Sequence, residues 1–194
     1  DFGLTPAGVF AQKLPNGRWH VLHEVVTFDI GLERFCSILK SELEMRFPGF
    51  EINIWGDPAG MQRDQIFETT AFDHLKTHGL LARPTATNDF RTRREAVAIP
   101  MGRLIDGKPG FMVNRKCQRL RKSLAGGYHF KRVAIGAGQE RFKDSPNKAS
   151  EHSHVGDAVG YCLLGGGEHR RMTVRPRSEY GNSTAKVLDF DVFS

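Results

Sequence analysis

Three aspartates at distant places in the chain have side chains that could bind divalent metal ions. Asp1 stands two residues before a glycine, Asp57 directly follows a short apolar run, and Asp157 lies in an apolar segment much further along. Carboxylates that a fold brings together repel one another unless a cation lies between them. Oxygen ligands of this kind favour Mg²⁺ or Mn²⁺ over Zn²⁺, and two such ions about 3.5 to 4 Å apart can promote phosphodiester hydrolysis.

A histidine close to the third aspartate adds a second kind of reactive group. His154 stands three residues before Asp157, so the two side chains are neighbours if this segment is helical. Tyr161 follows one turn further along the same face. An imidazole in this place could bind a metal ion, orient the aspartate or transfer a proton.

Each aspartate also has an ordinary structural explanation. Asp57-Pro58 with a nearby glycine is a good turn sequence. Asp1 could be no more than a chain end, and Asp157 could be an exposed acid on a helix. The three cysteines are far apart, with no Cys-x-x-Cys pair, and predict neither a disulfide framework nor a zinc site.

The positive charge of the chain is concentrated in one segment. The net charge is +6, and residues 112–150 hold ten Lys or Arg against two Asp or Glu. Such a segment can attract a phosphate backbone, although a solvated basic surface would have the same composition. The side chains that we expect to contact DNA phosphates are those of Arg115, Arg119, Lys122, Lys131 and Arg132.

The positioning elements predicted around these residues alternate between strands and helices. The 194 residues are 39% hydrophobic and 26% charged, which is typical of a globular domain, and no apolar run is long enough for a membrane span. The first residues lack the basic and apolar stretches of a secretory signal, so we expect a cytoplasmic protein.

Periodicity and turn signals predict, in order, a hairpin over 7–27, a helix capped by Asp29, a strand over 52–55, a helix over 65–77 and a strand over 80–85. A helix capped by Asn88, a short helix around 117–124, a basic hairpin over 128–143 and a helix over 150–164 follow. In the helix capped by Asn88, we expect Phe90, Val97, Met101 and Leu104 to face inward. This order predicts an α/β fold, in which reactive groups gather at the ends of adjacent strands.

Four short motifs resemble a known family, the C-terminal nuclease domain of the large terminase subunit of tailed double-stranded DNA bacteriophages. They are the residues 1–7 (DFGLTPA), 56–60 (GDPAG), 126–128 (GGY) and 153–158 (SHVGDA). The resemblance implies a ribonuclease H-like mixed sheet flanked by helices, with an added basic β-hairpin. It implies a nuclease domain over residues 1–166, and we expect residues 167–194 to be a tail of uncertain order.

The same resemblance implies a site and partners. Asp1, Asp57 and Asp157 match the metal-binding acids of the family, and His154 matches the histidine before the third acid, so two Mg²⁺ or Mn²⁺ ions are implied as cofactors. The implied partners are double-stranded DNA, an ATPase motor domain upstream in the same polypeptide, the small terminase subunit and the capsid portal, in the cytoplasm of the host cell. The chain itself contains no Gly-x-x-x-x-Gly-Lys-Ser/Thr loop for nucleotide phosphates.

The hypothesis from the sequence is therefore a metal-dependent, largely sequence-tolerant DNA endonuclease that cuts concatemeric viral DNA during packaging. Two alternatives stay open. One is a structure-selective DNA resolvase of the same fold, and the other is a DNA-binding or docking module whose acids are not catalytic.

Overall fold

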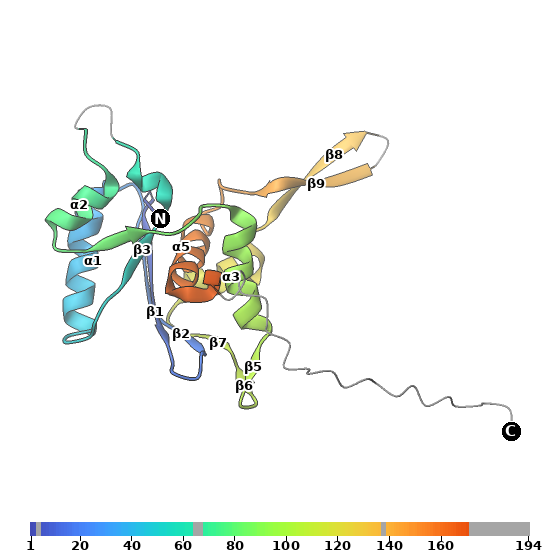
Figure 1. The fold of residues 1–194 in the computed structure, drawn as a ribbon. Helices are drawn as coiled ribbons and strands as arrows, with labels where there is room; N and C mark the ends of the chain where they lie inside the picture. Colours follow the sequence, from blue (N-terminus) through green and yellow to red (C-terminus); the bar gives the residue numbers. More distant parts are fainter. Residues whose placement is uncertain (3–4, 64–67, 137–138, 171–194) are drawn as a thin grey trace, which may run out of the picture.

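The computed structural model describes residues 1–2, 5–63, 68–136 and 139–170, which form a mixed α/β fold (Figure 1). An antiparallel hairpin of β1 (Ala7–Lys13) and β2 (Trp19–Val26) comes first, as expected. β7 (Phe111–Val113) pairs in parallel with the start of β2, which gives a three-stranded sheet in the order β1, β2, β7. β3 (Ile54–Gly56) and β4 (Ala82–Pro84) form a separate parallel pair.

The helices and the small strands complete the described part of the chain. They are α1 (Leu32–Arg46), the 3-10 turn η1 (Pro58–Met61), α2 (Ala71–Thr77), α3 (Phe90–Gly102), β5 (Leu104–Ile105), β6 (Lys108–Pro109), α4 (Gln118–Lys122), the wide turn η2 (Ser123–Gly127), β8 (Phe130–Gly136), β9 (Gln139–Pro146), α5 (Ser153–Leu163) and the wide turn η3 (Leu164–Glu168). None of the helices among these residues is long and apolar enough to cross a membrane.

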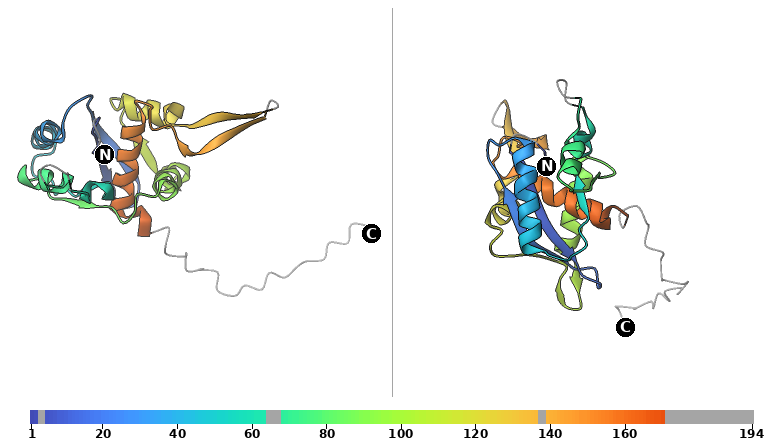
Figure 2. Two further views of the ribbon diagram at one scale, coloured as in Figure 1. Left: turned by 90° about the horizontal axis from the view of Figure 1, so that it is seen from above. Right: turned by 90° about the vertical axis from the view of Figure 1, so that its left-hand side faces the viewer.

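Two hydrophobic cores lie on opposite faces of the β1–β2 hairpin. One core joins Trp19 and Val21 to α3, α4 and α5, and the other joins Val25 to α1 and α2. The views in Figure 2 show these two groups of helices on either side of the hairpin. The alternation along β2 changes because Phe10 pairs with His23 and the next residue of β1 pairs with Val21, which leaves one extra residue on β2. Such a bulge lets one strand supply both cores.

Two helices begin at other residues than the sequence predicts. Asp29 adopts a left-handed backbone with φ of 50° instead of capping, and α1 begins after Gly31. The helix expected over 65–77 begins only at Ala71, because Thr70 and Asp73 form a capping box in which each side chain bonds the backbone of the other. Residues 65–67 of that expected helix lie outside the described residues.

The third helix is rotated relative to the prediction. Asp89, and not Asn88, caps α3 by accepting a hydrogen bond from the backbone of Thr92 at 2.8 Å. Met101 and Leu104, expected to face inward, are exposed. Arg93, Ala96, Val97 and Pro100 form the buried face of α3. Arg93 lies between α3 and α5, where its buried side chain pairs with Asp157 of α5.

A buried glutamate fixes the end of the described chain. Glu168 is 1% exposed and accepts hydrogen bonds from the indole of Trp19 at 2.9 Å and from Arg103 at 3.2 Å. These contacts attach η3 to the sheet and to the end of α3. The boundary expected at residues 166 and 167 falls within this turn, and residues 171–194 of the expected tail lie outside the described residues.

The segment between α4 and α5 forms an antiparallel hairpin of β8 and β9, which extends away from the two cores (Figure 2). Phe130 at the base of β8 contacts the ring of Phe90 on α3 edge to face. The turn is expected from the sequence over residues 135–138, but residues 135 and 136 belong to β8, and residues 137 and 138 lie outside the described residues. The two segments that flank the hairpin lie side by side before α5, since the amide of Asn147 donates to the carbonyl of His129 at 2.8 Å.

Candidate active site

The structure brings the three predicted aspartates toward one place. Asp1 precedes β1, Asp57 follows β3 and caps η1, and Asp157 lies in the second turn of α5. The carboxylates of Asp157 and Asp57 both act electrostatically on the main-chain nitrogen of Asp1. Tyr161 on α5 likewise feels the charges of Asp57 and Asp157. Segments more than fifty residues apart thus place these acids within electrostatic reach of the same groups.

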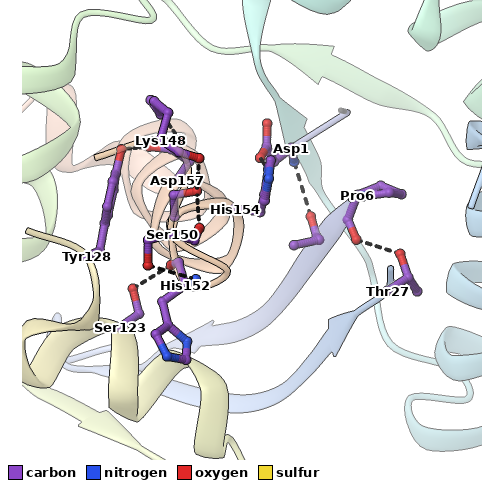
Figure 3. Close-up of polar contacts among 12 residues, drawn as sticks. Asp1, Pro6, Thr27, Ser123, Tyr128, Lys148, Ser150, His152, His154 and Asp157 are labelled. Atoms are coloured by element: carbon purple, nitrogen blue, oxygen red, sulfur yellow. Dashed lines mark hydrogen bonds and ion pairs between the residues drawn. The ribbon is translucent and has the colours of Figure 1, made fainter. Parts of the chain in front are cut away.

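His154 lies in direct contact with the first of these acids. Its Nδ1 is 2.6 Å from Oδ2 of Asp1 (Figure 3). A carboxylate only accepts hydrogen bonds, so Nδ1 carries the proton in this contact and Nε2 has a free lone pair. Burial lowers the pKa of His154, and the nearby Lys148 acts in the same direction, so the imidazole is neutral at neutral pH.

Asp157 is buried and neutralised by side chains from other elements. Its Oδ1 accepts hydrogen bonds from Arg93 and from the hydroxyl of Tyr128 at 3.1 Å, and its Oδ2 contacts Lys148. The side chains of Arg93 and Asp157 are each 6% exposed. Burial lowers the pKa of Arg93, but the Asp157 carboxylate together with Tyr161 and Tyr128 acts in the opposite direction, and the net shift is upward, so the guanidinium stays charged.

Two tyrosines hold two of the carboxylates by their hydroxyl groups. Tyr128 bonds Asp157, and Tyr161 bonds Asp57. Burial raises the pKa of both phenols, and the neighbouring carboxylates raise it further, so both hydroxyls stay protonated and act as donors. The backbone amide of Ala59 also donates to Asp57 at 2.9 Å. Each of the two acids therefore has a neutral donor beside it, and Asp157 has two cations in addition.

Two glycines on α5 make room for these partners. A Cβ atom on Gly156 would lie 2.6 Å from the ring of Tyr128, and one on Gly160 would lie 3.2 Å from Cβ of Arg93. Larger residues would push the phenol and the guanidinium away from Asp157. The small residues on this helix thus have a steric role in the site.

The oxygen donors suit Mg²⁺ or Mn²⁺, but they are not arranged around an ion in this state. Within residues 1–2, 5–63, 68–136 and 139–170, no three His, Cys, Asp or Glu side chains are placed to hold a metal ion. Both oxygens of Asp157 are already occupied by cations or a hydroxyl. The donor chemistry fits a divalent ion, but Oδ2 of Asp157 must lose its contact with Lys148 before it can bind one.

The predicted basic segment lies beside the acids. The hydroxyl of Ser123, at the end of α4, donates to the carbonyl of His152 at the start of α5 at 2.9 Å. Arg119 is occupied, since it pairs with Glu151 and lies over the ring of Phe28. Arg132 similarly pairs with Glu140 across the hairpin. The described contacts contain no ion pair for the exposed side chains of Arg115, Lys122 and Lys131.

Sequence reasoning missed Arg93 and Lys148, and it used Tyr128 only as part of the motif at residues 126–128. Arg93 stands three residues after Phe90 and four before Val97, on the stripe predicted to be buried, and this position was the available signal. Lys148 lies nine residues before Asp157 in an irregular segment, where spacing predicts no contact.

Comparison with known proteins adds one weak likeness. No protein-family model and no curated protein matches the chain. A similar solved structure is the crystal structure of the large terminase nuclease from thermophilic phage G20c with bound cobalt. It is 10% identical over 84% of each chain, with a TM-score of 0.44.

Proposed function

We propose that this chain is a metal-dependent DNA endonuclease that cuts concatemeric viral DNA during genome packaging. The convergence of Asp1, Asp57 and Asp157 from distant segments carries the proposal, because like charges are gathered in this way mainly where a cation binds. The four motifs that resemble terminase nucleases support the choice of substrate. We extend the proposal to a nuclease domain over residues 1–166 and to the partners implied by that resemblance.

Each residue of the site has a role in this proposal. Asp1, Asp57 and Oδ2 of Asp157 would hold two Mg²⁺ or Mn²⁺ ions. Bound ions of this kind neutralise a scissile phosphate and make water a better nucleophile. Tyr161 holds the Asp57 carboxylate in place. His154 is neutral and can accept a proton at Nε2, while its Nδ1 keeps Asp1 in position.

The experiment is a cleavage assay of the whole chain with Mn²⁺ or with EDTA. We expect nicking of supercoiled plasmid with Mn²⁺ and none with EDTA, and no preference for a four-way junction offered in the same tube. Preferential cleavage of the junction would favour the resolvase instead. Intact plasmid in every lane would contradict the endonuclease.

One observation favours a second candidate, a DNA-binding module without catalysis. Asp157 is fully paired with Arg93, Lys148 and Tyr128, as a purely structural acid would be. This candidate predicts that the chain retains DNA in a gel-shift assay and leaves it uncut when Mn²⁺ is supplied. The cleavage assay therefore separates the two functions directly.

DNA binding should depend on the exposed members of the basic segment. We expect the double variant Arg115→Ala/Lys122→Ala to bind all sequences more weakly and to lower the slope of log affinity against log salt by about two units, since each lost phosphate contact removes about 0.9. Adding Arg119→Ala should change the slope less than either of them, because Arg119 is already paired with Glu151. Fluorescence anisotropy at several salt concentrations measures both effects.

Lys40→Ala is a matched control, since Lys40 is a partly exposed lysine on α1, outside this segment. It should leave the salt dependence unchanged. A wild-type slope in the double variant would place the basic segment away from DNA.

A further inference from the structure

The two oxygens of Asp157 have partners of different kinds. Oδ1 is bonded by Arg93 of α3 and by Tyr128, which directly follows η2. Oδ2 contacts the ammonium of Lys148, which follows β9 (Figure 3). A divalent ion that uses this carboxylate must therefore replace the partner of one oxygen or the other.

The partners of Oδ1 are fixed. Nε of Arg93 donates to the carbonyl of Asn88 at 3.1 Å, and its guanidinium lies over the ring of Tyr161 at 4.5 Å. Its side chain is 6% exposed. Moving it would leave a buried charge without its partner, which is strongly unfavourable. Oδ1 is thus committed to the protein.

The partner of Oδ2 can leave easily. The side chain of Lys148 is 56% exposed, so its ammonium can move into water while its main chain stays in place. That main chain is anchored, because the hydroxyl of the buried Ser153 donates to the Lys148 carbonyl at 3.0 Å. The neighbouring amide of Asn147 donates to the carbonyl of His129 at 2.8 Å. The anchored main chain therefore keeps the ammonium within reach of Oδ2, and the exposed side chain can also reach solvent.

We propose that Lys148 is a built-in competitor of the divalent ion for Oδ2 of Asp157 and so sets the metal affinity of the site. This inference rests on the proposed function. The lysine occupies the oxygen of Asp157 that an ion would need. Metal binding and the Lys148–Asp157 contact are then mutually exclusive.

The test is a titration of the whole chain with Mn²⁺ alone, in which electron paramagnetic resonance counts the free ion and no DNA is present. We expect Lys148→Gln to bind Mn²⁺ roughly ten-fold more tightly than the wild type, since a cation beside an ion-binding oxygen opposes binding even when it is half screened. Lys148→Arg keeps the charge and should bind like the wild type. Circular dichroism confirms that each variant is folded.

Lys143→Gln is the matched control, because Lys143 is an exposed lysine on β9 that makes no described contact with Asp157. It should leave the dissociation constant within about two-fold of the wild type. Equal dissociation constants for the wild type and Lys148→Gln would contradict the competition by Lys148 but would not affect the proposed endonuclease function. Absence of Mn²⁺ binding by both proteins would instead remove the metal site, and the proposed function with it.

Discussion

Asp57→Asn is expected to lower Mn²⁺-dependent cleavage by at least about 100-fold, because groups that only support a metal ligand already cost 10- to 100-fold when removed. Asparagine keeps the acceptor oxygen that bonds the amide of Ala59, so η1 should keep its cap. What it loses is one negative charge in the acid centre. Initial rates of plasmid nicking at saturating DNA measure the effect, and the melting temperature verifies the fold.

Asp73→Asn is the matched control for this substitution. Asp73 also supports a helix start, by accepting a hydrogen bond from the backbone of Thr70 at 2.9 Å, but it belongs to α2 and not to the acid centre. Its replacement should leave cleavage unchanged. A wild-type rate in Asp57→Asn would exclude this carboxylate from the chemistry.

Arg93→Met is expected to lower the free energy of unfolding by about 3 to 5 kcal/mol, the range found when one partner of a buried ion pair is removed. Methionine fills a similar volume but leaves Asp157 without its buried cation. Lys148 and Tyr128 remain on the carboxylate and should place the loss toward the lower end of that range. Urea unfolding followed by fluorescence measures the change.

The adjacent arginine provides the control. Arg94 pairs with Glu95 at the surface, and its side chain is 53% exposed. Exposed pairs contribute about 0 to 1 kcal/mol, so Arg94→Met should unfold almost like the wild type. Adding Asp157→Asn to Arg93→Met should recover part of the lost stability, since the orphaned charge is then removed. Equal stability of Arg93→Met and Arg94→Met would show that the buried pair is not a stabilising element.

The sequence predicted the placement of the acids better than their surroundings. An apolar strand before Asp57 and an apolar helix around Asp157 were sufficient to expect both residues at a common edge, because buried elements of this kind pack together. The placement of His154 close enough to Asp157 to feel its charge follows from the same periodicity. The role of each acid in binding metal stays a prediction.

The partners of Asp157 could not be predicted from spacing. Arg93 comes from another helix, and Lys148 comes from an irregular segment whose path depends on the hydroxyl of Ser153. Periodicity describes which face of an element is buried, but it contains no information about which charge on a distant element meets that face. The same reason explains why the occupied state of Arg119 was missed, since Glu151 lies 32 positions later in the chain.

The glycines at positions 156 and 160 of α5 leave space for Tyr128 and Arg93, and this space is a feature of the site in addition to its carboxylates. The aspartate is preceded by one residue without a side chain and followed, three positions later, by another. A related chain with bulky residues at these two places would lack the space for the phenol and the guanidinium. Such a chain would need other partners for its aspartate. The two glycines can therefore distinguish chains that share the aspartate together with its arginine and tyrosine partners from chains that share only the aspartate.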